Sequence, residues 1–234
     1  MTGRFSENRI YNEDCVTAMP DMPPACVDMV LTDPPYNIVF RSNRRKERFD
    51  FIVNDDLPDA DFEQLLNAYF AECRRILKPD RFLISFMSWE TIPFFERAIR
   101  AAGFTIKSMP IWVKNNFGLG YYTRPQYEPM YLAMKGKPPP PETAISDILR
   151  FACVNSGDLE HSCQKPVALL QTLIRTFAPE GGLVFDGFMG SGSTAIAARK
   201  LNRKHIGFEI DPKTFEAAQN RIDTEFRQTS LLWE

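Results

Sequence analysis

Residues 183–194 read LVFDGFMGSGST, and this stretch decides how the surrounding chain folds. Its apolar start predicts a short buried strand, and the glycines after Asp186 predict a turn that leads into a helix over residues 195–201. A second strand is expected over residues 205–208, ending at Glu209. In such a unit the glycines let the backbone approach a ligand closely, and the helix N-terminus favours a negative group. An acid at the end of the next strand suits ribose hydroxyls, so the stretch predicts a nucleotide-type site.

The glycine turn has one structural alternative and one excluded function. The alternative is a tight turn that only packs its helix against the sheet, with Glu209 as a cap. The excluded function is phosphate binding of the kind found in nucleotide hydrolases, because no Lys followed by Ser or Thr stands in the turn.

A second motif, residues 32–36 with the sequence TDPPY, follows the apolar run 27–31. The run predicts a buried strand, and the prolines end it because each fixes its own φ and lacks an N–H. The stiff backbone presents the carboxylate of Asp33 and the carbonyl of Pro34, two acceptors without a donor between them. Tyr36 adds a flat ring beside them. Such a set suits the exocyclic amine of a planar heterocycle, and the alternative is a proline turn with a capping aspartate.

The composition is that of an ordinary globular protein. The 234 residues are 44% hydrophobic and 25% charged, so we expect one substantial core and a single domain over residues 1–234. The net charge of −2 excludes a global basic field, and any polyanion site must therefore be a local patch. The five cysteines show no zinc-type spacing, so we expect no metal and reduced thiols in a cytoplasmic protein. We expect neither a membrane span nor a signal peptide.

Periodicity and stop signals predict the remaining elements. An apolar stripe predicts a helix over residues 59–78 that Pro79 ends, and a strand follows over residues 81–86. Gly103 marks the end of a second helix over residues 88–102. The other expected elements are a strand at 9–12, a short helix closed by the prolines at 20, 23 and 24, strands at 104–113 and 129–134, and a helix at 165–177.

Three connecting segments are candidates for contacts with a polymer. Residues 37–58 lack periodicity and carry several basic residues, which suit phosphate contacts, although a solvated surface is the alternative. Residues 114–126 combine amides, aromatic rings and an arginine, which suit base stacking, although an ordinary turn is the alternative. Residues 136–160 begin with a proline-rich run, so we expect a surface excursion that contributes no central strand.

Together these residues resemble the S-adenosylmethionine-dependent DNA amino-methyltransferases, the class that acts on exocyclic nitrogens. Residues 33–36 match that family's catalytic motif, and residues 188–194 match its cofactor loop. The catalytic motif precedes the cofactor loop, as in the circularly permuted β group. Residues 161–166, HSCQKP, resemble a cofactor-proximal helix start that usually reads HPTQKP, with Ser162 and Cys163 replacing the Pro and Thr. Position 163 therefore carries a thiol where the usual motif has a hydroxyl.

The resemblance extends to the fold. Residues 13–15 resemble the family's acidic turn near the cofactor adenine, and residues 75–79 and 127–129 resemble framework segments. The implied fold is a doubly wound, mostly parallel α/β sheet of the Rossmann-like methyltransferase type, with its ligands at the carboxyl ends of the strands. Asp33 and the glycine loop are far apart in sequence, so they can meet only if their strands are neighbours in the sheet.

The resemblance also implies the cofactor, S-adenosylmethionine, and three sets of site residues. The implied catalytic residues are Asp33, Pro34, Pro35 and Tyr36. The implied cofactor-binding residues are Asp14, Cys15, Asp33, Lys165, Asp186, Phe188, Gly190, Ser191, Gly192, Ser193, Thr194 and Glu209. The implied DNA-binding residues are Asn37, Arg41, Arg44, Arg45, Lys46, Asn115, Tyr122 and Arg124.

The implied reaction is methyl transfer to N6 of an adenine flipped out of double-stranded DNA. Members of the family with Asp at the position of Asp33 act mostly on adenine, whereas those that act on cytosine N4 more often carry Ser there. Three alternatives stay open: cytosine N4, an RNA base or protein glutamine, and a cofactor-binding module without catalysis. Relatives that act on RNA or protein usually carry Asn at this position.

The resemblance implies a cellular context as well. We expect a bacterial or phage protein of the cytoplasm, associated with the nucleoid and with a role in restriction-modification. The stretch 136–160 lies where the family keeps its target-recognition region, and it is short. A homodimer, in which a second subunit helps to grip the duplex, is therefore a hypothesis of the sequence.

Overall fold

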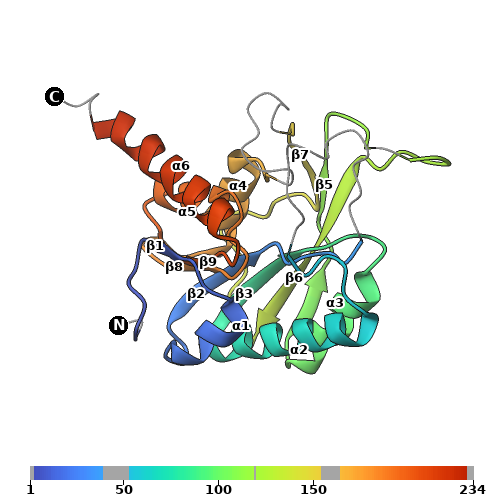
Figure 1. Cartoon of the computed structure of the whole chain (residues 1–234), viewed down its shortest axis with the longest axis horizontal. Coiled ribbons are helices and arrows are strands. Elements are labelled where there is room, and N and C mark those ends of the chain that lie inside the picture. The colour runs from blue at the N-terminus through green and yellow to red at the C-terminus, as the bar shows by residue number, and fades with distance from the viewer. Residues whose placement is uncertain (1–2, 39–52, 119, 154–163, 231–234) are drawn as a thin grey trace.

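The computed structural model describes residues 3–38, 53–118, 120–153 and 164–230, and its centre is a mostly parallel sheet between two layers of helices (Figure 1). The strand order is β1-β9-β8-β2-β3-β6-β5-β7, and β4 pairs with β6. The strands are β1 (Arg9–Tyr11), β2 (Val27–Thr32), β3 (Leu77–Phe86), β4 (Thr105–Ser108), β5 (Ile111–Val113), β6 (Tyr127–Lys135), β7 (Ile148–Arg150), β8 (Leu183–Asp186) and β9 (Lys204–Phe208). The helices are α1 (Cys15–Ala18), the 3₁₀ turn η1 (Met19–Asp21), α2 (Asp59–Ile76), α3 (Ile92–Ala101), α4 (Val167–Phe177), α5 (Ser193–Lys200) and α6 (Pro212–Ser230).

The central strands are buried on both faces, which confirms the doubly wound α/β fold. Every residue of β2 is buried, as is typical of parallel strands that helices cover on both sides. Val30 and Leu83 belong to one core, together with the inward face of α2. Leu31 and Ile84 belong to a second core, together with the leucines of α4. Alternate residues of one strand therefore serve opposite layers, because side chains alternate across a strand.

The pairing of β2 with β8 brings the two sequence motifs together. The two strands are parallel neighbours, with Met29 opposite Val184 and Val30 opposite Phe185. Their carboxyl ends therefore meet at one edge of the sheet, where Asp33 follows β2 and the glycine turn follows β8. The expectation that these strands are neighbours is confirmed.

The expected boundary between the helix at 59–78 and the next strand is wrong. Helix α2 ends at Ile76, and Leu77 already pairs with Val27 in β3. Pro79 therefore lies inside the strand, where the register with β2 shifts between Val27 and Met29. A proline is tolerated at such a bulge because the ladder hydrogen bond is already interrupted there. The helix ends before the proline, because its C-cap residue, Leu77, is already in the extended conformation.

Two other boundaries differ for reasons visible in the backbone. Helix α3 begins at Ile92 and not at 88, because residues 88–91 form a turn in which the Thr91 N–H donates to the Ser88 carbonyl (3.2 Å). The strand expected over 104–113 is split into β4 and β5 around Pro110, which cannot donate to a ladder. Gly103 does end α3, with a left-handed φ of 86°.

The excursion at 136–160 contributes a short strand, β7, which is the last strand in the order of the sheet. Strand β7 lies parallel to β5, with Leu149 opposite Trp112. The Trp112 Nε1–H donates to the carbonyl of Phe151 (2.8 Å), which fastens the excursion to β5. Residues 154–160 lie outside the described residues. Among the helices that the structure describes, none has the length and apolar character needed to cross a membrane.

Candidate active site

A buried tyrosine of α2 ties together the ends of β2 and β8. The hydroxyl of Tyr69 lies 2.7 Å from the Thr32 hydroxyl, and it accepts a hydrogen bond from the Gly187 N–H (3.3 Å). A Cβ on Gly187 would lie 2.5 Å from the Tyr69 ring, so this position requires glycine. Sequence reasoning placed Tyr69 only on an apolar helix stripe and missed this role, because the partners are distant in sequence.

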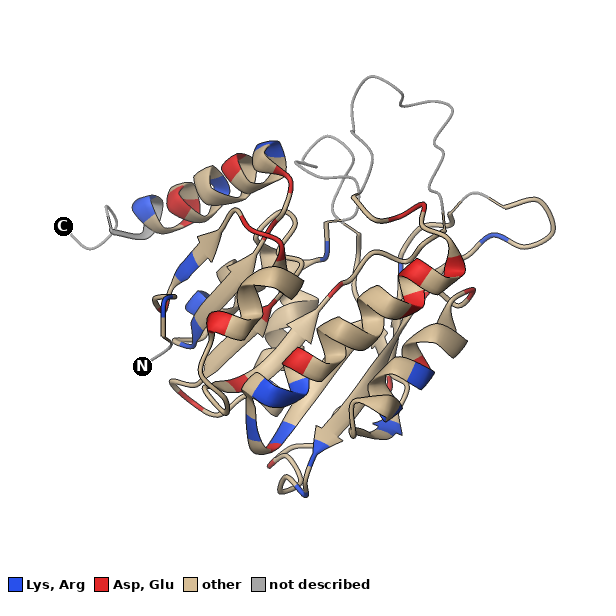
Figure 2. Cartoon of the chain, turned by 60° about the horizontal axis from the view of Figure 1, so that its bottom comes forward, with Lys and Arg blue, Asp and Glu red and all other residues tan. Residues whose placement is uncertain are grey.

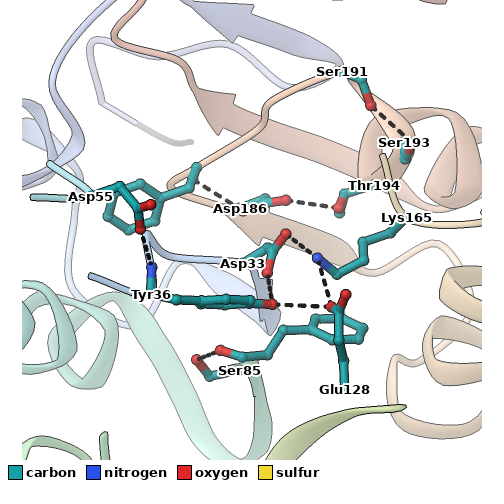
Figure 3. Close-up of polar contacts among 12 residues, drawn as sticks. Asp33, Tyr36, Asp55, Ser85, Glu128, Lys165, Asp186, Ser191, Ser193 and Thr194 are labelled. Carbon is teal, nitrogen blue, oxygen red and sulfur yellow. Dashed lines mark hydrogen bonds and ion pairs between the residues drawn. The ribbon is translucent and has the colours of Figure 1, made fainter. Parts of the chain in front are cut away.

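Asp33 is the centre of a polar cluster at this edge of the sheet (Figure 3). The Tyr36 hydroxyl donates to Asp33 Oδ1 at 2.6 Å, and the Lys165 ammonium group donates to Asp33 Oδ2. Both carboxylate oxygens therefore have a partner already. Lys165 comes from the segment before α4, and its ammonium group also lies 5.5 Å from the centre of the Tyr36 ring. The neighbouring Pro34 and Pro35 are buried.

Glu128 of β6 is a second carboxylate in the same cluster, and sequence reasoning assigned it only to a framework segment. Its Oε2 lies 3.1 Å from the Lys165 ammonium and 3.2 Å from the Tyr36 hydroxyl, and its Oε1 lies 2.5 Å from the Lys114 ammonium. Burial works against ionisation, but the ammonium groups of Lys165 and Lys114 outweigh it and lower the pKa of Glu128 to about 2. Glu128 is therefore ionised at neutral pH.

The side-chain amide of Asn37 is hydrogen-bonded to the backbone at the other end of its loop. Its side chain exchanges two hydrogen bonds with the backbone of Leu57, at 2.9 and 2.7 Å. The backbone N–H groups of Tyr36 and Asn37 both donate to Asp55 Oδ1, at 3.1 and 2.8 Å. These contacts join the two ends of the segment 37–58 and fix Tyr36 beside Asp33. The Asn37 side chain thus has a structural role within this segment.

The glycine turn after β8 is organised by Asp186. Its Oδ2 accepts from the Thr194 hydroxyl at 2.7 Å, and its Oδ1 accepts from the Phe188 N–H at 3.1 Å. Burial raises the pKa of Asp186 to about 7, and the nearby charge of Asp33 acts in the same direction. Asp186 therefore shapes the turn, and the charge of the carboxyl group is sensitive to pH near neutrality.

The serines of the turn are bound to a helix that the sequence analysis did not connect with the site. Arg221 of α6 donates to the Ser191 carbonyl at 2.7 Å and to the Ser193 hydroxyl at 2.9 Å. Both serines are buried. Their contribution to a ligand therefore comes chiefly through the backbone of the turn that they stabilise. A long-range contact of this kind leaves no local pattern in the sequence.

The turn and Glu209 fit a nucleoside-type cofactor. Gly190 has a positive φ of 51°, and a Cβ built on it would meet only the Phe188 carbonyl, at 4.0 Å, so the turn faces open space there. Glu209 follows β9, and its carboxylate accepts from the N–H groups of Gly190 and Asp211, each at 2.9 Å. Each oxygen retains a further lone pair for a ligand hydroxyl. The acid is thus held beside the open face of the turn.

The acidic turn before α1 follows β1, which is parallel to β9, so it lies at the same carboxyl edge of the sheet as Glu209. Asp14 caps α1 by accepting from the Val16 N–H at 3.1 Å. Cys15 is buried in the core that also contains Phe185 and Phe208. Burial, with help from the charge of Asp14, raises the pKa of the Cys15 thiol well above its ordinary value. A thiol in this state is a poor nucleophile, so Cys15 can line a site but is unsuited to covalent catalysis.

The predicted DNA contacts divide into three groups. Arg41, Arg44, Arg45 and Lys46 lie outside the described residues. Asn115 accepts from the Cys153 N–H at 2.8 Å and so connects the hairpin between β5 and β6 to the excursion. Tyr122 and Arg124 lie on that hairpin, where the Tyr122 side chain is 96% exposed. Within the described ranges, no group of His, Cys, Asp and Glu side chains could hold a metal ion.

Comparison with known proteins identifies relatives over most of the chain. A family model described as DNA methylase matches residues 27–220. YubD of Escherichia coli strain K12, a methylase by name, is 33% identical over 92% of this chain and 90% of its own length. YhdJ of the same strain, named a DNA adenine methyltransferase, is 26% identical over 92% of this chain and 82% of its own length.

Solved structures agree with the fold. The structure of the M1.HpyAVI–SAM complex matches with a TM-score of 0.70 and 25% identity, over 92% of this chain and 98% of that one. The PvuII DNA methyltransferase, named cytosine-N4-specific, matches with a TM-score of 0.74 and 18% identity, over 95% of this chain and 92% of that one. At that identity the second likeness concerns the fold alone.

Proposed function

Because the chain belongs to the N6/N4 family of DNA methylases, we propose that it transfers a methyl group to the N6 amine of an adenine flipped out of double-stranded DNA. Its cofactor is S-adenosylmethionine, which supplies an electrophilic methyl group on a sulfonium sulfur. The observation that carries the proposal is the position of Asp33, which directly follows β2, the neighbour of the strand that leads into the cofactor turn. The acceptor and the cofactor loop therefore share one edge of the sheet.

The chemistry required of Asp33 is orientation of a poor nucleophile. The lone pair of an exocyclic amine is delocalised into its ring. Hydrogen bonds from the amine to the Asp33 carboxylate and the Pro34 carbonyl would turn the nitrogen towards tetrahedral geometry and direct its lone pair at the methyl group. The carboxylate would also stabilise the positive charge that develops on nitrogen. Tyr36 would stack on the extruded base, which must leave the duplex to reach the pocket.

Adenine is favoured over cytosine by two observations. Asp33 is the residue that predominates in the family members acting on adenine, and YhdJ, whose name is DNA adenine methyltransferase, aligns over 92% of this chain. A carboxylate can accept hydrogen bonds from either amine, so Asp33 alone does not reject cytosine. A purine offers the Tyr36 ring a larger stacking surface than a pyrimidine does.

The hairpin over residues 114–126 is the proposed surface for the duplex. It projects away from the sheet between β5 and β6 (Figures 1 and 2). Its base is fixed by the bond from the Gly118 N–H to the Pro125 carbonyl (2.7 Å) and by Arg124, whose guanidinium lies 5.4 Å from the Phe117 ring centre. Its tip carries Tyr121 and Tyr122, which are 95% and 96% exposed. Rigid, exposed aromatic rings beside a basic residue suit stacking on bases.

The hairpin also starts and ends at the active site. Lys114 opens it, and Glu128 follows two residues after its last residue, Gln126. These two side chains pair with each other at 2.5 Å, and Glu128 contacts Tyr36. A duplex held by the tip would therefore lie close to the site that receives its extruded base.

We expect Tyr122→Ala to weaken binding to DNA by about 5- to 150-fold, the usual loss for one stacked base. Tyr122→Phe keeps the ring and should bind within about twofold of the unchanged protein. Fluorescence anisotropy with a labelled duplex at fixed salt measures both. Equal affinities for Tyr122→Ala and the unchanged protein would remove the hairpin tip from the DNA surface.

The reaction is tested by transfer of label from methyl-labelled S-adenosylmethionine to DNA, RNA and protein in parallel. Label that appears in double-stranded DNA alone supports the proposal. Label in RNA or protein would assign a different substrate class. Cofactor binding with no transfer to any of the three would leave a binding module without catalysis.

A further inference from the structure

The carboxylate that must hold the target amine is engaged on both oxygens. Asp33 Oδ1 accepts from the Tyr36 hydroxyl, and Oδ2 accepts from the Lys165 ammonium. An ammonium group on this carboxylate opposes the positive charge that develops on the amine during methyl transfer, because like charges repel strongly in a partly buried site. The Asp33 carboxylate therefore stabilises that charge better when Lys165 is not paired with it.

Glu128 is placed to receive both partners of Asp33. Its Oε2 already lies 3.1 Å from the Lys165 ammonium and 3.2 Å from the Tyr36 hydroxyl (Figure 3). We propose that Glu128 is a positioning residue, which takes over Lys165 and the Tyr36 hydroxyl when the target amine binds to Asp33. The shift requires small movements, because the three side chains are already in contact.

The surroundings of Glu128 suit this role. Lys114 holds the other carboxylate oxygen at 2.5 Å, so Oε2 stays aimed at the cluster. Asp33 and Glu128 carry two negative charges, and Lys114 and Lys165 carry two positive charges. Moving Lys165 from one carboxylate to the other therefore leaves the net charge of the cluster unchanged. The low pKa of Glu128, about 2, keeps this acceptor ionised at neutral pH.

The inference rests on the proposed use of Asp33 as the acceptor for an amine, but not on which base carries that amine. It differs from the sequence-based expectation for Lys165, which assigned this lysine to the cofactor. The two roles predict different consequences when Lys165 is removed. Under the present inference, the Lys165 ammonium competes with the target amine for Asp33 in a protein that lacks the Glu128 carboxylate. Removing Lys165 from such a protein should therefore restore activity.

The test is a double-variant cycle assayed at saturating cofactor. Glu128→Gln keeps the shape but removes the charge, so Lys165 should remain on Asp33 and kcat should fall by about 10- to 100-fold. The affinity of Glu128→Gln for S-adenosylmethionine should stay within about twofold of that of the unchanged protein. A cooperative thermal unfolding transition should show that the variant is folded. Adding Lys165→Met to Glu128→Gln should then raise kcat by about tenfold above Glu128→Gln alone, because the competing ammonium is gone. Lys114→Met, which retains the Glu128 carboxylate that receives Lys165, should lose less activity than Glu128→Gln.

Two results would overturn the inference. If Lys165→Met lowers kcat further in the Glu128→Gln background, Lys165 does not compete for Asp33. If Glu128→Gln retains full kcat, no carboxylate is needed to receive Lys165. An active Asp33→Ala variant would instead contradict the proposed function itself, so the two failures are distinguishable.

Discussion

Replacement of Asp33 by alanine is expected to lower methyl transfer by at least about 100-fold, while cofactor affinity stays nearly unchanged. The carboxylate serves the amine, whereas the glycine turn follows β8 and Glu209 follows β9. The variant should fold, because Lys165 keeps Glu128 as its ion-pair partner. Single-turnover transfer to DNA measures the loss, and isothermal titration with S-adenosylmethionine measures the affinity.

Asp33→Asn is the matched control for shape. It retains a carbonyl acceptor but loses the negative charge that stabilises the developing cation, so its activity should lie between those of Asp33→Ala and the unchanged protein. Activity of Asp33→Ala within about threefold of the unchanged protein would show that another group holds the amine. A large loss of cofactor affinity would instead assign Asp33 chiefly to the cofactor.

Replacement of Glu209 by alanine is expected to weaken binding of S-adenosylmethionine by about 1.5–3 kcal/mol, which is about 10- to 150-fold. The carboxylate is the proposed acceptor for the ribose hydroxyls, and it also accepts from the N–H groups of Gly190 and Asp211. Its removal therefore deprives both the ligand and the turn of an acceptor. Titration calorimetry measures the loss, and thermal unfolding in the absence of cofactor separates it from a folding defect.

Glu209→Gln separates the charge from the hydrogen bonds. The amide oxygen can still accept, so this variant should bind the cofactor more tightly than Glu209→Ala. Burial raises the pKa of Glu209, so cofactor affinity of the unchanged protein should decline at a less acidic pH than an exposed glutamate would give. The Gln variant should lack this part of the pH dependence. Unchanged affinity in a folded Glu209→Ala protein would remove the residue from the site.

Local patterns predicted the parts of the fold that depend on neighbouring residues. The strand, glycine turn, helix and strand over residues 183–208 follow from apolar runs and glycines, and the structure reproduces them. The fold class came from two motifs whose strands, β2 and β8, are adjacent. The end of the helix at Ile76 was missed, because β3 pairing takes Leu77 into the sheet before Pro79 is reached.

The candidate site was predicted where its residues stand in motifs and missed where they converge from afar. Asp33 and Tyr36 were identified from the prolines between them. Glu128 and Tyr69 were not, because Glu128 contacts Tyr36 from 92 positions away and Tyr69 contacts Thr32 from 37 positions away. Asn37 was assigned to DNA from its place in a polar loop, but its amide binds the Leu57 backbone. Only the folded arrangement decides between an exposed amide and an internal one.

The most direct test of the account is the identity of the methylated base. DNA that has been methylated by the purified protein is digested to nucleosides and analysed by mass spectrometry, with the Asp33→Ala protein as the blank. The account predicts N6-methyladenine in the digest of the active protein and none in the blank. N4-methylcytosine without N6-methyladenine would contradict it and assign the same site geometry to the amine of the other base.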